Sequence, residues 1–185
     1  MAHSKAYLEE LKILHSKKTF GRNENIPESV VQILEEKNIT SFLDYGAGKG
    51  LTSRTMNTLY PNIKLHTYDP VTFPGALPEQ VEFTYSSDVL EHVEPDLLVT
   101  TIQDLCDITT RYQYHLIACH PAKKVLSDGR NAHLIIENPD WWKSKLDNLQ
   151  GWNIIHEDTI ERYANKVKKG PALYILKYIV MLEKV

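Results

Sequence analysis

The stretch Ser41 to Gly50 reads SFLDYGAGKG and joins a short apolar run to a cluster of three glycines. The apolar run that ends at Asp44 predicts a buried strand, and Leu51 to Leu59 predicts the helix that follows it. Glycine lets the chain turn sharply and lets a ligand approach the backbone, while the start of the helix directs amide donors into the same crevice. In an open parallel sheet, ligands bind beyond the carboxyl ends of the strands. The stretch therefore predicts a ligand-binding strand–loop–helix unit.

The spacing of these glycines argues against two common phosphate-binding loops. A P-loop requires Gly-x-x-x-x-Gly-Lys-Ser/Thr, but Lys49 is followed by Gly50. A dinucleotide loop requires Gly-x-Gly-x-x-Gly, which would place the third glycine at Leu51 rather than at Gly50. A nicotinamide-dependent dehydrogenase is therefore a distant alternative.

Length and composition limit the class of protein. The chain has 185 residues with 42% apolar and 24% charged side chains, which fits one globular domain and excludes a disordered chain. The net charge of −3 does not favour non-specific nucleic-acid binding. The chain contains neither a long apolar run nor a signal-peptide core, so we expect a cytoplasmic protein without a membrane partner. Cys106 and Cys119 are too few for a disulfide framework or a cysteine zinc site.

Apolar segments with strand and helix periods alternate outward from the glycine cluster. This order predicts an α/β fold with a mostly parallel sheet, in which the last two strands pair antiparallel. We expect a single domain over residues 1–185, made of N-terminal helices over 1–40 and a ligand-binding core over 41–185. The predicted helices are 5–14, 27–37, 51–59, 95–108 and 139–149. The predicted strands are 41–44, 63–68, 81–86, 112–119, 152–155 and 172–182, with a lysine-bearing connection from Ile160 to Gly170.

Four motifs together resemble a known superfamily. The acid Asp44 followed by Gly-x-Gly-x-Gly resembles motif I of the class I S-adenosylmethionine-dependent methyltransferases. Asp69 follows the predicted second strand, where the family has an acid that binds the ribose hydroxyls. The segment Ser86 to Val93, SSDVLEHV, looks like the family's strand-four segment. Asn131 to Leu134 and Gly151-Trp152 are similar to its late passages. The resemblance implies a Rossmann-like fold and S-adenosylmethionine as cofactor.

One departure from the family lies after Asp69. Only 18 residues separate Asp69 from Ser87, where the family normally has a helix, a third strand and a loop that contacts adenine. We therefore expect a sheet shortened between strands two and four, and we assign no adenine partner. This compactness is similar to small methyltransferases carried by bacteriophages, and a viral protein would act in the cytoplasm of its host.

The resemblance also implies roles for individual residues. Asp44 would lie near the methionine amino group of the cofactor, and Asp69 would accept its ribose hydroxyls. Asp88 would lie where the methyl group points, and His92 or His133 could act as a base near neutral pH. The predicted catalytic residues are thus Asp88, His92 and His133. The predicted cofactor-binding residues are Asp44, Tyr45, Gly46, Ala47, Gly48, Asp69, Pro70, Ser87 and Asp88.

The acceptor and the need for a metal are left open by the sequence. The leading prediction is methyl transfer to an oxygen or nitrogen atom of a small molecule, with no metal. However, Asp88-x-x-Glu91-His92 with the later His133 resembles the metal site of Hen1-type RNA methyltransferases. Those four residues could hold Mg²⁺, Mn²⁺ or Zn²⁺ in an RNA or DNA methyltransferase, which would need a cationic cleft beside Asp88. A module that binds the cofactor without turnover is a third alternative.

Overall fold

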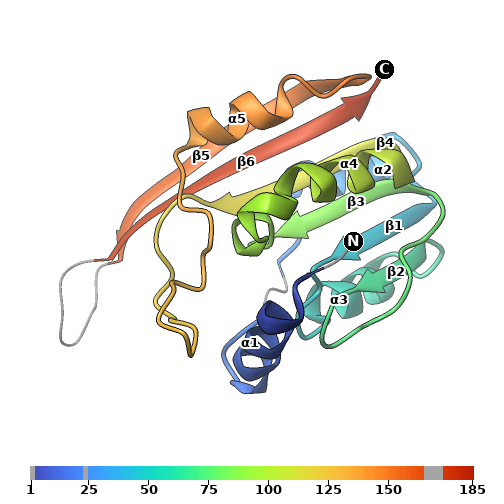
Figure 1. The fold of residues 1–185 in the computed structure, drawn as a ribbon. Coiled ribbons are helices and arrows are strands. Elements are labelled where there is room, and N and C mark those ends of the chain that lie inside the picture. The colour runs from blue at the N-terminus through green and yellow to red at the C-terminus, as the bar shows by residue number, and fades with distance from the viewer. Residues whose placement is uncertain (1–2, 23–24, 165–172) are drawn as a thin grey trace.

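A computed structural model of the protein describes residues 3–22, 25–164 and 173–185. Its centre is a six-stranded sheet in the order β2-β1-β3-β4-β6-β5. Strands β2, β1, β3 and β4 run parallel, whereas β6 is antiparallel to both β4 and β5. The expected α/β fold with a mostly parallel sheet is confirmed (Figure 1). The strands are β1 Ser41–Tyr45, β2 Lys64–Tyr68, β3 Val81–Ser87, β4 Thr109–Ala118, β5 Trp152–Ala164 and β6 Leu173–Lys184.

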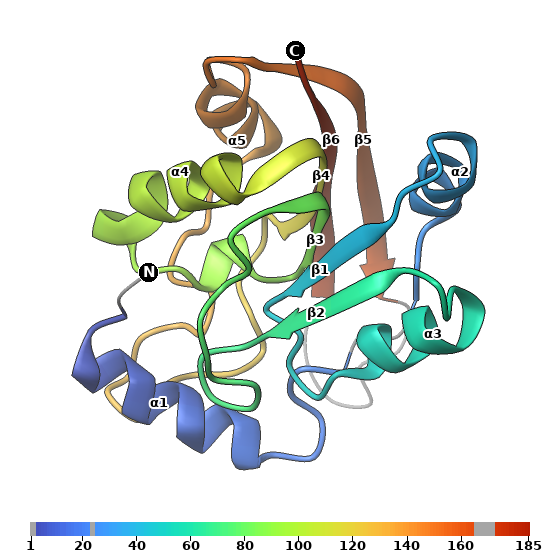
Figure 2. The ribbon, with the colours of Figure 1, turned by 90° about the vertical axis from the view of Figure 1, so that its right-hand side faces the viewer.

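Helices cover both faces of the sheet, as Figure 2 shows. Helices α2 and α3 pack on one face, and α4 and α5 pack on the other, while α1 lies beside the carboxyl ends of the parallel strands. No helix in the described ranges is long and apolar enough to span a bilayer. The helices are α1 Lys5–Ser16, α2 Glu28–Glu36, α3 Leu51–Leu59, α4 Leu98–Ile108 and α5 Pro139–Leu146, with short 3₁₀ turns at Leu90–His92 and Pro95–Leu97.

Apolar side chains on both faces of the sheet form the core, because successive side chains of each strand point to opposite faces. In β1, Phe42 packs with Met56 of α3, and its neighbour Leu43 packs with Leu105 of α4. Successive side chains of a strand point to opposite faces, so a continuous apolar run is needed where both faces are covered. Parallel strands buried in this way bring their carboxyl ends to one edge of the sheet.

The sheet is shortened where the sequence predicts it. Residues 69–80 connect β2 to β3 without a helix or strand, apart from an isolated bridge between Asp69 and Phe73. Three prolines in this segment limit regular backbone hydrogen bonding. Strand β2 is therefore an edge strand.

Strand β5 differs from the prediction, which begins a connection at Ile160. This boundary is wrong, because β5 continues to Ala164 and pairs with β6, with Arg162 opposite Ile175. Side chains in this part of β5 are mostly exposed, so the apolar alternation that marks a half-buried strand is missing. Pairing with β6 stabilises it instead. The rest of the predicted connection, 165–170, lies outside the described residues.

Two other element ends shift by three residues. Strand β4 begins at Thr109 rather than Tyr112, because α4 leads directly into it and Thr109 is fully buried. Helix α5 ends at Leu146 rather than Leu149, and Asp147 caps it with its amide hydrogen-bonded to the Lys143 carbonyl oxygen.

Candidate active site

A cavity of about 490 Å³ lies at the carboxyl ends of the parallel strands. All nine predicted cofactor residues line it, as do His92 and His133. The first turn of α3 begins at the same edge, directly after the glycine loop. Helix α1 and the segment that follows it add Tyr7, His15 and Gly21 to the lining. The N-terminal segment therefore contributes to the same cavity as the core.

The glycine loop is required by the close packing of protein atoms around it. Gly46 and Gly48 have φ values of +73° and +55°. A Cβ atom on Gly46 would lie 2.5 Å from a methyl group of Val89, and one on Gly48 would lie 2.6 Å from the carbonyl oxygen of Gly21. The Lys49 amide donates to that same oxygen at 2.8 Å. These glycines thus let the loop pack closely against Val89 and Gly21, and the local sequence does not reveal this reason for them.

Asp44 is buried at the end of β1 with few partners. Its Oδ2 accepts a hydrogen bond from the Ser53 hydroxyl at 2.6 Å, and that hydroxyl lies 2.8 Å from Thr67 Oγ1. Burial raises the pKa of Asp44 to about 6, although the Ser53 hydrogen bond opposes the shift. A cationic group placed beside this carboxyl would stabilise its ionised form.

Asp69, at the end of β2, joins two loops. Its Oδ2 accepts from the Gly48 amide at 3.1 Å, and its Oδ1 accepts from the Val71 and Thr72 amides at 2.9 and 3.0 Å. His15 Nε2 lies 3.7 Å from Oδ2. A carboxylate offers about four acceptor positions, so three amides leave room for one further donor.

Asp88 follows β3 in a left-handed conformation, with a φ of +54°. Both of its carboxylate oxygens accept from Lys177 Nζ, at 2.6 and 2.7 Å. Lys177 lies on β6 opposite Ala118 of β4, and it also lines the cavity. Sequence reasoning missed Lys177, because only the pairing of β4 with β6 brings it to Asp88.

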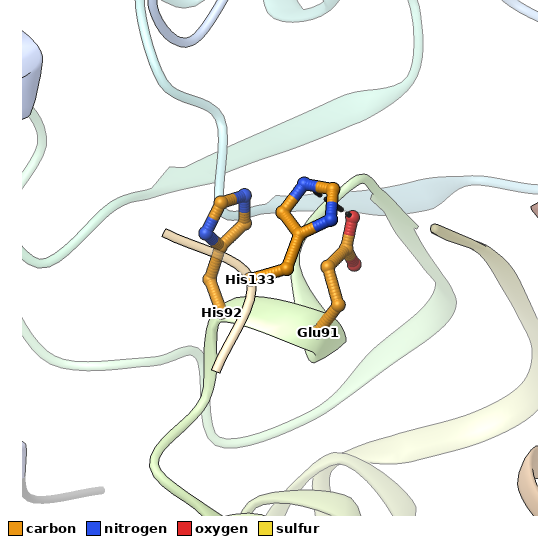
Figure 3. A group of neighbouring side chains, drawn as sticks. All are labelled: Glu91, His92 and His133. Carbon is orange, nitrogen blue, oxygen red and sulfur yellow. Dashed lines mark ion pairs between the residues drawn. The ribbon is translucent and has the colours of Figure 1, made fainter. Parts of the chain in front are cut away.

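Glu91, His92 and His133 form a cluster (Figure 3), and both histidines line the cavity. His92 Nδ1 lies 2.6 Å from the Ala132 carbonyl oxygen, and His133 Nδ1 lies 2.5 Å from that of His120. A carbonyl oxygen only accepts, so each Nδ1 carries the hydrogen and each neutral ring keeps the lone pair of Nε2. His133 Nε2 lies 4.0 Å from Glu91 Oε1.

Burial shifts the pKa of each of the three side chains in this cluster. Glu91 is fully buried, and neither carboxylate oxygen has a hydrogen-bond partner within the described ranges. Burial, and then the charge of Asp88, raise the pKa of Glu91 well above its ordinary value. Burial lowers the pKa of His92 to about 4 and also lowers that of His133. The cluster therefore holds neutral imidazoles beside a carboxyl that needs a proton or a cation.

Cationic side chains line the cavity although the whole chain has a net charge of −3. Lys124 Nζ lies 4.8 Å above the ring of Phe20 and has no hydrogen-bond partner in the part of the chain that the structure describes. Of the residues that the structure describes, Lys177 is the cation that contacts Asp88. Among the described residues, the charged lining comprises Arg22, Lys123, Lys124, Arg162 and Lys177, against Asp44, Asp69 and Asp88.

Solved structures share this arrangement of strands and helices. The 1,6-didemethyltoxoflavin-N1-methyltransferase of Burkholderia thailandensis superposes with a TM-score of 0.62 at 14% identity, over 100% of this chain and 91% of that one. The magnesium protoporphyrin IX methyltransferase of Synechocystis PCC 6803 gives 0.51 at 11% identity, over 98% and 95%. The chain has the class I methyltransferase fold. No protein-family model and no curated protein matches the sequence.

Within this class I methyltransferase fold, the structure brings most of the predicted residues together. The predicted cofactor residues lie at the carboxyl ends of β1 and β3 or directly after β1, β2 and β3, and the predicted catalytic histidines lie beyond β3. Three of the four residues proposed as the alternative metal site lie together, and the fourth does not. Asp88 pairs with Lys177 and is not part of the cluster of Glu91, His92 and His133.

Proposed function

We propose that the protein transfers a methyl group from S-adenosylmethionine to an oxygen or nitrogen atom of a small molecule. The observation that carries this proposal is the pair of buried acids at the ends of β1 and β2, placed on either side of the glycine loop in one cavity. The two solved methyltransferases named above contain bound S-adenosylhomocysteine, which supports the choice of cofactor. A single domain in the cytoplasm, similar to small phage methyltransferases, is part of the same proposal.

The proposed roles follow from the contacts of each acid. Asp44 would hold the cofactor's amino group, whose positive charge stabilises the ionised form of a carboxyl that burial otherwise disfavours. Asp69 would accept a ribose hydroxyl at its remaining acceptor position. Pro70, Ala47 and Ser87 would contact the nucleoside. Asp44 and Asp69 would thus bind the amino group and the ribose of the same cofactor molecule.

The bound cofactor would supply a methyl group activated by a positively charged sulfur. The main task of the chain is then alignment, which contributes roughly 7–11 kcal/mol in ideal cases. The rigid edge of a parallel sheet suits this task, because its strand ends hold the acids at fixed positions. His92 and His133 each offer a lone pair on Nε2, but burial lowers the pKa of both, which makes them weak proton acceptors near neutral pH.

A transfer assay tests the proposal. Purified protein is incubated with S-adenosylmethionine labelled in the methyl group, together with separate pools of metabolites and nucleic acids. We expect label in the metabolite pool. Label in the nucleic-acid pool alone would favour the RNA or DNA methyltransferase, and tight cofactor binding without any transfer would favour the binding module.

Glu91 supports a second candidate, in which a divalent metal assists the transfer. One of its unpartnered oxygens and one ring nitrogen of each histidine lie within 4.8 Å of one another. Backbone carbonyls fix both imidazoles, as is usual for histidines that bind metal. Nitrogen-rich sites favour transition metals such as Zn²⁺ or Mn²⁺ over Mg²⁺. Three protein ligands would leave a position at which a metal could polarise an acceptor hydroxyl.

Metal analysis tests this second candidate without reference to activity. If it holds, the purified protein contains Zn²⁺ or Mn²⁺, and Glu91→Gln loses the metal. If the site holds a proton instead, the protein binds neither ion in calorimetry, and methyl transfer is insensitive to chelators. Glu161→Gln, on the exposed part of β5, is the matched control.

A further inference from the structure

Beyond the predicted cofactor residues, the cavity continues across the sheet. The cofactor residues belong to β1, β2, β3 and the loops that follow them, whereas β4, β6 and β5 supply Ala118, Lys177 and Arg162 to the lining. In the sheet order, these three strands lie on the far side of β3 from β1. If the cofactor occupies the first part, the second part is where an acceptor would lie.

In this second part of the cavity, Lys177 is a cation that an ion pair with Asp88 holds in place. Its ammonium group has three N–H donors, and the two oxygens of Asp88 accept two of them. The third donor has no acceptor among residues 3–22, 25–164 and 173–185. The two side chains are only 20% and 36% exposed, so the ion pair is partly shielded from water. Asp88 therefore holds one ammonium group at a fixed place with a donor to spare.

The valence of the acceptor atom decides which nucleophile this donor suits. An amine nitrogen has one lone pair, which attack on the methyl group consumes, so a hydrogen bond from Lys177 would block it. An ionised oxygen has three lone pairs and can accept from Lys177 while another attacks. Charge acts in the same direction, since Asp88 neutralises Lys177 while Arg162 of β5 also lines this part of the cavity. The remaining positive charge favours an anion and disfavours a protonated amine.

We propose that Lys177, positioned by Asp88, selects acceptors with an acidic hydroxyl, such as phenols, and holds them in the ionised form. The hydroxyl proton goes to water. A lone pair of the oxygen anion forms the new bond to the methyl carbon, and the electron pair of the broken carbon–sulfur bond stays on sulfur. The products are a methyl ether and a neutral thioether. The inference rests on the proposed methyl transfer and narrows its acceptor to oxygen.

Absorption spectra of 4-nitrophenol test the inference, because its phenolate absorbs at longer wavelength than the neutral phenol. The probe is titrated with protein saturated with S-adenosylhomocysteine, at a pH where most of the free probe is protonated. We expect binding to enrich the phenolate. Lys177→Met should weaken phenolate binding by roughly 10- to 100-fold, as expected for loss of a charge-assisted hydrogen bond. Lys64→Met, at the exposed first position of β2, should leave binding unchanged.

Three controls make the test decisive. The double variant Lys177→Met/Asp88→Asn removes both charges, and it should also lose phenolate enrichment, which shows that an unpaired Asp88 is not the cause. Equal enrichment in the wild type and Lys177→Met, or tighter binding of 4-nitroaniline than of 4-nitrophenol, would overturn the inference. The heat of S-adenosylhomocysteine binding is measured separately, and its absence would overturn the proposed function itself.

Discussion

Asp44 lowers the stability of the fold that positions it. Its pKa of about 6 exceeds the ordinary value near 4, so the folded protein binds this proton more tightly than the unfolded chain. As the pH rises through this window, the unfolded chain ionises first and the fold loses stability. The full cost, about 3 kcal/mol, is present above pH 6. A carboxyl retained at such a cost is consistent with a role in binding a cation.

Asp44→Asn is therefore expected to stabilise the protein at neutral pH. The amide is neutral and can still accept from Ser53, so we expect an increase of about 1–3 kcal/mol in the free energy of unfolding at pH 8. The gain should shrink by roughly half at pH 5, where Asp44 in the folded protein is already protonated. Urea unfolding at the two pH values measures this. A variant that is less stable at both would contradict the assignment.

Asp69 combines a structural role with the proposed binding role. Asp69→Asn keeps one acceptor oxygen for the loop amides, but it replaces the other with an NH2 group that cannot accept, and it removes the charge offered to the ribose. We expect cofactor affinity to fall by ~1.5–3 kcal/mol in calorimetry, because a charge-assisted hydrogen bond is lost. Asp107→Asn, exposed on α4, should change nothing. Unchanged affinity in Asp69→Asn would remove Asp69 from the site.

At the scale of elements, the contact between Gly21 and Gly48 joins the segment after α1 to the glycine loop. A Cβ on Gly48 would meet three backbone atoms of Gly21 within 2.9 Å, and backbone cannot give way as a side chain can. Gly129 has a φ of +91° but nothing within 4 Å of its Cβ position. Alanine at either position would thus have left-handed backbone strain, but only alanine at Gly48 would clash with other protein atoms.

Gly48→Ala should consequently destabilise the protein more than Gly129→Ala. We expect a difference of about 1–3 kcal/mol in the free energy of unfolding, since overpacking adds to the left-handed strain that both variants share. Cofactor affinity should fall only in Gly48→Ala, because the clash displaces the cavity wall. Equal losses of stability in the two variants would show that the contact with Gly21 is unimportant.

Helix α1 closes one side of the cavity and also supports the cluster that contains His92. Leu11 and Leu14 pack against Leu126, and the Tyr7 hydroxyl donates to the His92 carbonyl oxygen at 2.6 Å. Helix α1 is thus tied both to the loop after β4 and to the 3₁₀ turn that carries Glu91 and His92. Loosening α1 should open the cavity without unfolding the sheet.

Leu14→Ala tests this coupling. Removal of a fully buried leucine side chain costs about 2–5 kcal/mol, and we expect much of that cost to fall on the docking of α1. Hydrogen exchange should accelerate in α1 and in the loop near Leu126, while the central strands stay protected. Ile13→Ala, at a neighbouring position that is 47% exposed, should have little effect. Uniform acceleration throughout the sheet would contradict a locally docked helix.

At the scale of the whole molecule, local patterns predict most of the architecture. Apolar runs of strand length and helical spacing identify nearly every element, and 18 residues after Asp69 are too few for a further helix and strand. The second half of β5 cannot be predicted from apolar periodicity, because pairing with β6 stabilises it rather than burial of its side chains. The same limit applies to the site. Lys177 reaches Asp88 only through the register of β4 with β6, which no local signal encodes.

Charge is also distributed in a way that composition conceals. The chain is acidic overall, yet five Lys or Arg side chains among the described residues line its cavity. Two of the facing acids, Asp44 and Asp69, accept hydrogen bonds from protein groups, and Asp88 pairs with Lys177. The cavity therefore combines buried carboxylates, which suit the cationic amino group of the proposed cofactor, with cations such as Arg162 and Lys177, which suit an anionic acceptor.

The central claim is that this cavity binds S-adenosylmethionine, and calorimetric titration tests it most directly. Injection of S-adenosylmethionine and of S-adenosylhomocysteine into the wild-type protein should give saturable heat with one molecule bound per chain. Adenosine alone should bind more weakly, because it lacks the amino group that Asp44 would hold. A titration in which neither compound produces binding heat above dilution would contradict the account.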